Sequence, residues 1–269
     1  MKATNTRTAL GASVQIQQIS KTYHTREGQT VQALEDINLN VQPGEFIAVL
    51  GPSGCGKSTL LSMLAGLLTP TSGSIFIDNE PLVKAHRKAA VVFQTDLLLY
   101  WRSVLKNILL PLEIEGGDIE EYTRRARILL KKVGLEGFEG KHPSELSGGM
   151  RQRVAICRAL IQEPGLLLMD EPFGALDALT REQMIMDLQQ LWLSQRNTVI
   201  FITHGIEEAV FLADRVLVMS PRPGRIDLEL HIDLPRPRSW AVHGDPKFID
   251  YISQIREIFE SKGVLNAAY

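Results

Sequence analysis

Residues 51–58 read Gly51-Pro52-Ser53-Gly54-Cys55-Gly56-Lys57-Ser58. The residues before this loop, 46–50, are all apolar and predict a buried strand. The residues after it predict a helix over 57–68, which ends before Pro70. A glycine-rich loop between a strand and a helix is the context of a phosphate-binding loop, because its backbone N–H groups and the helix start face the anion. The loop therefore predicts a nucleotide-binding α/β protein.

Three side chains of this loop have expected roles. Lys57 is expected to reach the β- and γ-phosphates, Ser58 to ligate Mg²⁺ through its hydroxyl, and Thr59 to supply the next N–H donor. The alternative is a glycine-rich turn that precedes a helix and binds nothing.

Two carboxylates follow a second apolar run. Residues 166–169 predict a buried strand, and Asp170 and Glu171 come directly after it. Asp170 is expected at the sheet edge near the loop, where it can hold Mg²⁺ directly or through water. Glu171 can orient the attacking water as a general base, and the sequence leaves open whether it removes a proton or only aligns the water. The alternative is a pair of acids that cap a helix.

A second anion site is predicted at residues 146–152, which read Leu146-Ser147-Gly148-Gly149-Met150-Arg151-Gln152. Ser147 is a natural N-cap for a helix over 150–162, and two glycines at a helix start expose backbone N–H groups. The alternative is a glycine-containing N-cap without a ligand.

The chain as a whole alternates predicted strands and helices, which predicts an α/β fold with a helical insertion. Expected strands cover 14–19, 33–41, 74–78, 89–93, 198–203 and 215–219, and a helix covers 120–133. We expect a flexible N-terminus at 1–12 and one domain at 13–245. The domain divides into a core at 13–94 and 164–220, an insertion at 95–163 and a proline- and arginine-rich extension at 221–245, which we expect to be solvated rather than an anion sensor. A helix and tail follow at 246–269.

Bulk properties exclude some classes of protein. The net charge of −2 gives no sign of a basic surface for nucleic acid. Cys55 and Cys157 lack metal or redox spacing, which favours free thiols in a reducing compartment. The N-terminus lacks the apolar core of a signal peptide, and no apolar run is long enough to span a membrane. We expect a soluble chain that partners hold at a membrane if it works there.

The two loops and the carboxylate pair, in this order, resemble the ATP-binding subunits of ABC transporters over about 14–224. Residues 146–152 are similar to the signature loop of that family. In that family two ATP-binding cassettes pack head to tail, so that ATP lies between the phosphate loop of one and the signature loop of the other. The resemblance implies ATP and Mg²⁺ as cofactors and a P-loop core with an N-terminal antiparallel β region. The residues it implies for contact with ATP in trans are Leu146, Ser147, Gly148, Gly149 and Gln152.

Four further positions match family elements. Tyr23 stands where the family places a ring on adenine, and Gln94 resembles the glutamine that senses Mg²⁺. Asp177 resembles the loop that crosses the dimer interface, and His204 the histidine that contacts the γ-phosphate. The alternatives are that Tyr23 is only a half-buried aromatic residue of a strand and that Gln94 is a polar residue at the end of a strand. Asp177 would then belong to a plain turn, and His204 would have no special role. The family often has Asp after this histidine, whereas this chain has Gly205.

The resemblance also implies partners: a second copy of the chain, two membrane permease subunits and, indirectly, a periplasmic or lipid-anchored solute-binding protein. The location would be peripheral, on the cytoplasmic face of the inner membrane. Residues 97–101, Leu-Leu-Leu-Tyr-Trp, resemble the surface that grips a permease helix, with the core of the insertion as the alternative. Residues 169–182, 206–213 and 219–226 look like the nitrate, sulfonate and taurine importer branch, which also serves pyrimidine precursors of thiamine.

A different class of function is an ABC ATPase of DNA repair or chromosome maintenance. Those proteins place a very long coiled coil between the phosphate loop and the signature. Here only about ninety residues separate Lys57 from Ser147, without sustained heptads. The sequence therefore favours an importer ATPase.

Overall fold

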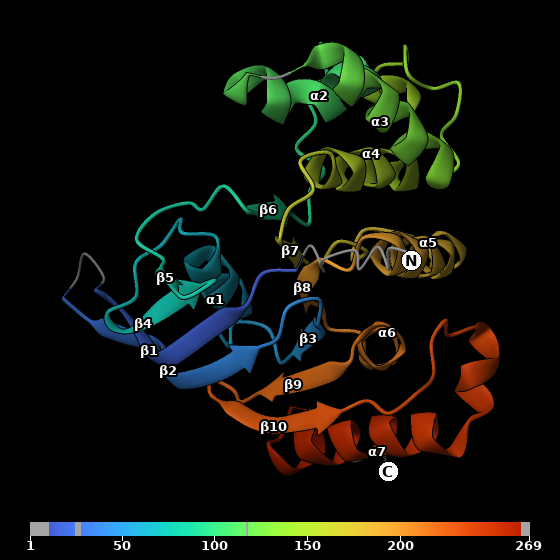
Figure 1. The fold of residues 1–269 in the computed structure, drawn as a ribbon. Helices are drawn as coiled ribbons and strands as arrows, with labels where there is room; N and C mark the ends of the chain where they lie inside the picture. The colour runs from blue at the N-terminus through green and yellow to red at the C-terminus, as the bar shows by residue number, and fades with distance from the viewer. Residues whose placement is uncertain (1–10, 25–27, 117, 265–269) are drawn as a thin grey trace, which may run out of the picture.

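The computed structural model describes residues 11–24, 28–116 and 118–264, and two β-sheets organise them (Figure 1). The first sheet is antiparallel, in the order β2-β1-β4-β5. Its strands are β1 (Val14–His24), β2 (Thr30–Val41), β4 (Ser72–Ile77) and β5 (Glu80–Pro81). The expected N-terminal antiparallel β region is therefore confirmed.

The second sheet has the strand order β10-β9-β3-β8-β7-β6. Its strands are β3 (Phe46–Leu50), β6 (Ala89–Val92), β7 (Leu166–Asp170), β8 (Thr198–Ile202), β9 (Arg215–Met219) and β10 (Ile226–His231). All pairings are parallel except that of β10 with β9. The central strands are continuous apolar runs because both faces of the sheet are covered.

Some helices cover this central sheet, and others form a separate group above it. The elements are α1 (Lys57–Leu64), α2 (Val104–Glu115), α3 (Ile119–Lys132), η1 (Pro143–Glu145), α4 (Gly148–Leu160), α5 (Ala178–Gln195), α6 (Ile206–Leu212), η2 (Trp240–Gly244) and α7 (Pro246–Ser261). Helices α2, α3 and α4 lie together at the top of Figure 1, away from the antiparallel sheet. One apolar core joins this group to the central sheet, and another lies between the two sheets around α1.

Several expected boundaries differ from the structure. Helix α1 ends at Leu64 rather than at residue 68, because Gly66 adopts a left-handed φ of +69° that closes the helix. Strands β1 and β2 extend beyond the expected 14–19 and 33–41. Most of the expected N-terminal segment 1–12 lies outside the described residues, and Ala12 at its end is buried. The proposed division into core, insertion and extension stays a prediction.

The proline- and arginine-rich extension is only partly solvated, which corrects the expectation for 221–245. It contributes β10 to the central sheet, and Arg238 is only 3% exposed. The guanidinium of Arg238 donates hydrogen bonds to five backbone carbonyls, those of Val210, Phe211, Ala213, Ile232 and Leu234. Arg236 pairs with Asp214 and lies 4.4 Å from the ring centroid of Trp192. Arg238 is buried because the end of α6 needs donors for its free carbonyls.

We predict that Arg238→Met lowers the free energy of unfolding by about 3 kcal/mol, because it removes a charged donor from buried carbonyls. Chemical denaturation measures the change. Arg256→Met is the control, since the side chain of Arg256 is 57% exposed and its substitution should change little. Equal effects of the two substitutions would contradict the structural role of Arg238.

Candidate nucleotide site

The phosphate loop lies between the end of β3 and the start of α1. Gly54 and Gly56 adopt φ values of +77° and +107°, which side chains other than glycine rarely take. A Cβ on Gly56 would also lie 2.6 Å from Cδ2 of Leu34. The loop therefore needs glycine here for both its backbone conformation and its close approach to β2.

Lys57 places a positive charge inside the loop. Its side chain is buried, and its ammonium donates hydrogen bonds to the carbonyls of Gly51, at 2.7 Å, and Pro52, at 3.1 Å. The ammonium and the N–H groups at the start of α1 together form a cradle for a phosphate group.

Ser58 and Asp170 meet at the same sheet edge. The hydroxyl of Ser58 donates a hydrogen bond to Oδ1 of Asp170 at 3.3 Å. Burial raises the pKa of the Asp170 carboxyl and the charge of Glu171 adds to this effect, whereas Ser58 and Lys57 lower it. A hydroxyl and a carboxylate are oxygen ligands that suit Mg²⁺, and a cation between them would offset the cost of burying the carboxylate.

The described side chains near Ser58 and Asp170 do not form a complete metal site by themselves. Within residues 11–24, 28–116 and 118–264, no group of three or more His, Cys, Asp or Glu side chains could hold a metal ion. Mg²⁺ usually binds through one or two protein ligands together with the substrate's phosphates. The residues present therefore fit a cation that arrives with a nucleotide.

Glu171 and His204 face each other beside the cradle. Oε2 of Glu171 lies 3.4 Å from Nδ1 of His204, which follows β8. Glu171 has a left-handed φ of +44°, and its N–H donates to the carbonyl of Ile202. A non-glycine residue in this conformation is strained, and such residues cluster at functional sites.

A cavity of about 300 Å³ brings residues of the phosphate loop together with Glu171. Its lining residues are Tyr23, Val31, Ala33, Ser53, Gly54, Gly56, Lys57, Ser58, Thr59, Glu171 and Arg222. The hydroxyl of Tyr23 lies 3.4 Å from that of Thr59, so strand β1 carries an aromatic ring to the cavity wall. The cavity thus offers an aromatic wall, a phosphate cradle and a carboxylate in one space.

Sequence reasoning missed Arg222 as a lining residue. Its Nε and Nη2 donate to the carbonyl of Gly54 at 3.3 and 3.2 Å. The neighbouring Gly224 donates its N–H to the carbonyl of Ala33 and so fixes the segment against β2. The only signal was an arginine next to prolines after the last predicted strand, a pattern also typical of a solvated linker.

The signature loop lies at the start of α4. Oγ of Ser147 accepts a hydrogen bond from the N–H of Met150, which confirms Ser147 as an N-cap. A Cβ on Gly149 would lie 2.4 Å from Cγ2 of Thr180, so the start of α5 packs against this glycine. Leu146 and Gln152 are buried, and their side chains lie inside the protein rather than on its surface.

Asp177 and Gln94 are two further residues of the expected site. Asp177 is the N-cap of α5 and accepts a hydrogen bond from the N–H of Thr180 at 3.0 Å, which lowers the pKa of its carboxyl. Gln94 follows β6, and its Nε2 lies 3.3 Å from the place that a Cβ on Gly174 would occupy. Gln94 therefore contacts the loop that follows Glu171.

The structure does not bring the two anion-binding loops together. The signature borders a second hollow of about 300 Å³, lined by Ser147, Gly149, Met150, Arg153, Leu179, Thr180 and Gln183. This hollow shares no lining residue with the cavity at the phosphate loop. Of the expected site residues, those of the phosphate loop, Asp170, Glu171, His204 and Tyr23 lie together, and those of the signature lie apart.

Comparisons with known proteins identify the family. A family model described as ABC transporter matches residues 34–174. An uncharacterized ABC transporter ATP-binding protein of Methanocaldococcus jannaschii is 46% identical over 87% of this chain and 87% of its own length. A taurine import ATP-binding protein of Rhizobium johnstonii is 46% identical over 91% of this chain and 96% of its own.

Two further similarities cover most of the chain. An aliphatic sulfonates import ATP-binding protein of Bacillus cereus is 40% identical over 95% of this chain and 99% of its own length. A solved dimeric cassette in a post-hydrolysis state, bound to ADP and Pi, is 34% identical with a TM-score of 0.71. The matched region covers 82% of this chain and 100% of the solved chain. The expected fold and family resemblance are confirmed.

We predict that Lys57→Ala weakens nucleotide binding by about ten- to a hundredfold, because the cradle loses its one ammonium. Titration with a fluorescent nucleotide measures the affinity. Lys84→Ala, at an exposed position outside the cavity, is the control. An unchanged affinity for the Lys57 variant would remove the phosphate loop from the binding site.

Proposed function

Because this chain belongs to the ABC transporter family, we propose that it is the ATP-hydrolysing subunit of an importer for small organic sulfonates or related solutes. The observation that carries the proposal is the nucleotide cavity, where Lys57, Ser58 and Glu171 share one wall and His204 lies against Glu171. Hydrolysis of ATP coupled to transport is the activity of this family. Its relatives give no support to a role in DNA repair.

The site is proposed to be completed by a second copy. The signature hollow is separate from the nucleotide cavity within one chain, and the similar solved cassette is dimeric. In a head-to-tail dimer, Ser147 and the N–H groups of Gly148 and Gly149 face the γ-phosphate held by the partner. Leu146 and Gln152 contribute by packing beneath this loop, since both side chains are buried.

The proposed chemistry is the transfer of the γ-phosphoryl group to water. Lys57 and the loop N–H groups hold the phosphates, and Glu171 orients the water for in-line attack. When bound, Mg²⁺ would neutralise charge on the phosphates, with Ser58, Asp170 and Gln94 as the residues to hold it or its waters. His204 lies beside Glu171, and its proposed role is to contact the γ-phosphate. The products are ADP and phosphate.

Attachment to membrane subunits is proposed through the start of the insertion. Leu97, Tyr100 and Trp101 are 54%, 53% and 76% exposed, and together they offer apolar anchors for a short permease helix. No helix within residues 11–24, 28–116 and 118–264 has the length and apolar character needed to cross a membrane. We therefore propose a peripheral location on the cytoplasmic face of the inner membrane, with two permease subunits and a solute-binding protein as partners.

We predict that Glu171→Gln slows ATP hydrolysis by at least about a hundredfold and leaves ATP affinity within a few fold, because only the water loses its orienting group. Phosphate release measures turnover, and light scattering in ATP should show an accumulated dimer. Glu182→Gln is a control for the loss of a carboxylate outside the nucleotide cavity. Undiminished hydrolysis by the Glu171 variant would contradict the assigned role.

The cargo class is tested in cells. Deletion of the gene should abolish growth on taurine or an alkanesulfonate as sole sulfur source and leave growth on sulfate intact, since sulfonate uptake would lack its motor. The wild-type chain should restore growth, and the Lys57→Ala chain should not. Growth tests on nitrate and on pyrimidine precursors distinguish the related cargoes. Unimpaired growth of the deletion strain on sulfonates would exclude the proposed cargo.

A further inference from the structure

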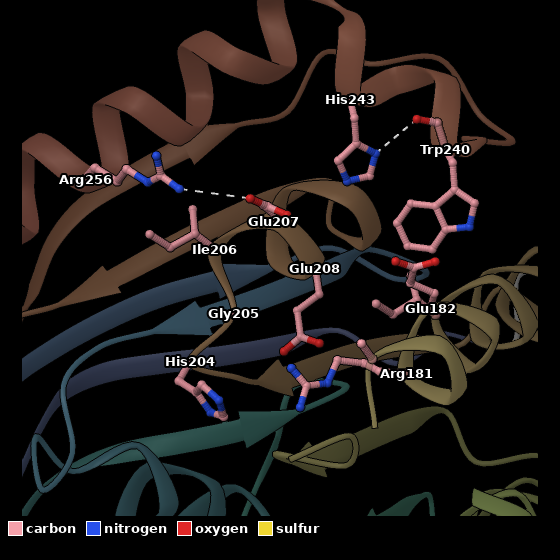
Figure 2. Close-up of a pocket in the computed structure, with 12 residues that line it drawn as sticks. Arg181, Glu182, His204, Gly205, Ile206, Glu207, Glu208, Trp240, His243 and Arg256 are labelled. Atoms are coloured by element: carbon pink, nitrogen blue, oxygen red, sulfur yellow. Dashed lines mark hydrogen bonds and ion pairs between the residues drawn. The ribbon is translucent and has the colours of Figure 1, made fainter. Parts of the chain in front are cut away.

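A larger cavity is lined in part by His204 and shares no lining residue with the nucleotide cavity. Its volume is about 730 Å³, and its walls come from α5, α6, η2 and α7 (Figure 2). Among its lining residues, Oε2 of Glu208 and Nε of Arg181 are buried without a hydrogen-bond partner. Hydrolysis, as described above, gives no role to either residue.

Glu208 holds the backbone turn that carries His204. Its Oε1 accepts a hydrogen bond from the hydroxyl of Thr203, and the N–H of Gly205 donates to that hydroxyl oxygen at 3.0 Å. The Gly205 N–H also interacts with the Glu208 carboxyl. Both neighbours of His204 in the chain are thus tied to one carboxyl group.

The carboxyl fits here because residue 205 has no side chain. A Cβ on Gly205 would lie 2.8 Å from Cγ, Cδ and Oε1 of Glu208. The aspartate that the family often has at this position would therefore require Glu208 to move. This chain lacks that aspartate, and the carboxyl group of Glu208, one helical turn later, lies beside Gly205 instead.

Arg181 places a positive charge near the same carboxyl. It lies in the first turn of α5, and its N–H donates to the carbonyl of Asp177 at 2.9 Å. In Figure 2 its guanidinium points toward the carboxyl of Glu208. The positive charge of Arg181 therefore favours the ionised form of the carboxyl that holds the turn of His204, and His204 lies against Glu171.

We propose that Glu208 is a positioning residue for hydrolysis, whose ionised carboxyl group holds the turn that carries His204 and so keeps His204 against Glu171. The inference rests on the proposed function, since it assigns a role in that same site. Glu208 acts through His204 and touches no nucleotide group itself.

The titration of Glu208 gives this role a pH signature. Burial raises the pKa of its carboxyl to about 7, with a further increase from Glu171, whereas the charge of Arg181 and the N–H of Gly205 lower it. The other titratable groups lining the cavity are Glu182 of α5, His204 and Glu207 beside it, His243 of η2 and Arg256 of α7. The carboxyl therefore changes charge near neutral pH.

The sign of the effect on stability follows from the raised pKa. The folded protein binds this proton more tightly than the unfolded chain, so the stabilising contribution is complete below the ordinary pKa of 4.5. It is lost as the pH rises through about 7. An ionised Glu208 thus costs stability at pH 8, as expected for a residue kept for function rather than for folding.

The test compares Glu208→Gln with Glu207→Gln, an exposed carboxylate on the same helix. Both purified variants are assayed for ATP hydrolysis between about pH 6 and pH 8.5, a range that spans the titration of Glu208. Wild type and Glu207→Gln should gain kcat as the pH rises. Glu208→Gln should match wild type at pH 6 and fall at least about fivefold below it at pH 8, with KM for ATP within about twofold, because the phosphate cradle is unchanged.

Two further measurements separate positioning from folding. Glu208→Gln should melt at a higher temperature than wild type at pH 8 and by a smaller margin at pH 5, because the amide carries no buried charge. Arg181→Met should lower kcat at pH 8 in the same direction as Glu208→Gln. A wild-type pH profile in Glu208→Gln, or an equal loss at every pH, would overturn the proposal.

Failure of this inference is distinct from failure of the proposed function. Hydrolysis by the wild-type chain and its arrest in Glu171→Gln test the proposed function without involving Glu208. If both are observed and Glu208→Gln keeps the wild-type profile, only the positioning role is wrong.

Discussion

The nucleotide site depends on the alignment of three parallel strands. Strands β7, β8 and β3 are neighbours in the central sheet, and all three run in the same direction. Their interiors are apolar and buried on both faces, so polar groups emerge only where the strands end. The phosphate loop follows β3, the carboxylate pair ends β7, and His204 follows β8. The carboxyl ends of these strands thus bring together residues that lie more than a hundred positions apart in the chain.

Functional residues could be predicted from the sequence where they directly follow an apolar run. Lys57, Asp170 and Glu171 could be placed from local patterns, because the end of a buried strand and the start of a helix have few alternative locations. Arg222 and Glu208 could not be placed in this way. The position of Arg222 depends on the return of the chain to β2, and that of Glu208 on the space left by Gly205. Both are properties of tertiary packing, which periodicity does not report.

The C-terminal extension shows the same limit. Its prolines and arginines are typical of a solvated linker, yet Arg238 supplies donors to carbonyls at the end of α6. Helix ends leave carbonyls without partners, and a distant guanidinium can satisfy several of them. These contacts hold η2 and α7 against α6, where they form the far wall of the cavity beside His204. The extension is therefore part of the surroundings of His204.

The placement of the phosphate loop and the signature loop supports the proposal that a second copy completes the site. Gly56 packs closely against Leu34 of β2, and Gly149 packs closely against Thr180 of α5. Each loop is thus fixed to a different part of the fold, and bringing them together within one chain would break both contacts. Two copies can instead meet across a shared nucleotide and leave each loop in place. The binding energy of ATP is then available to shift the equilibrium between open and closed dimers, which is the form of coupling that a transporter requires.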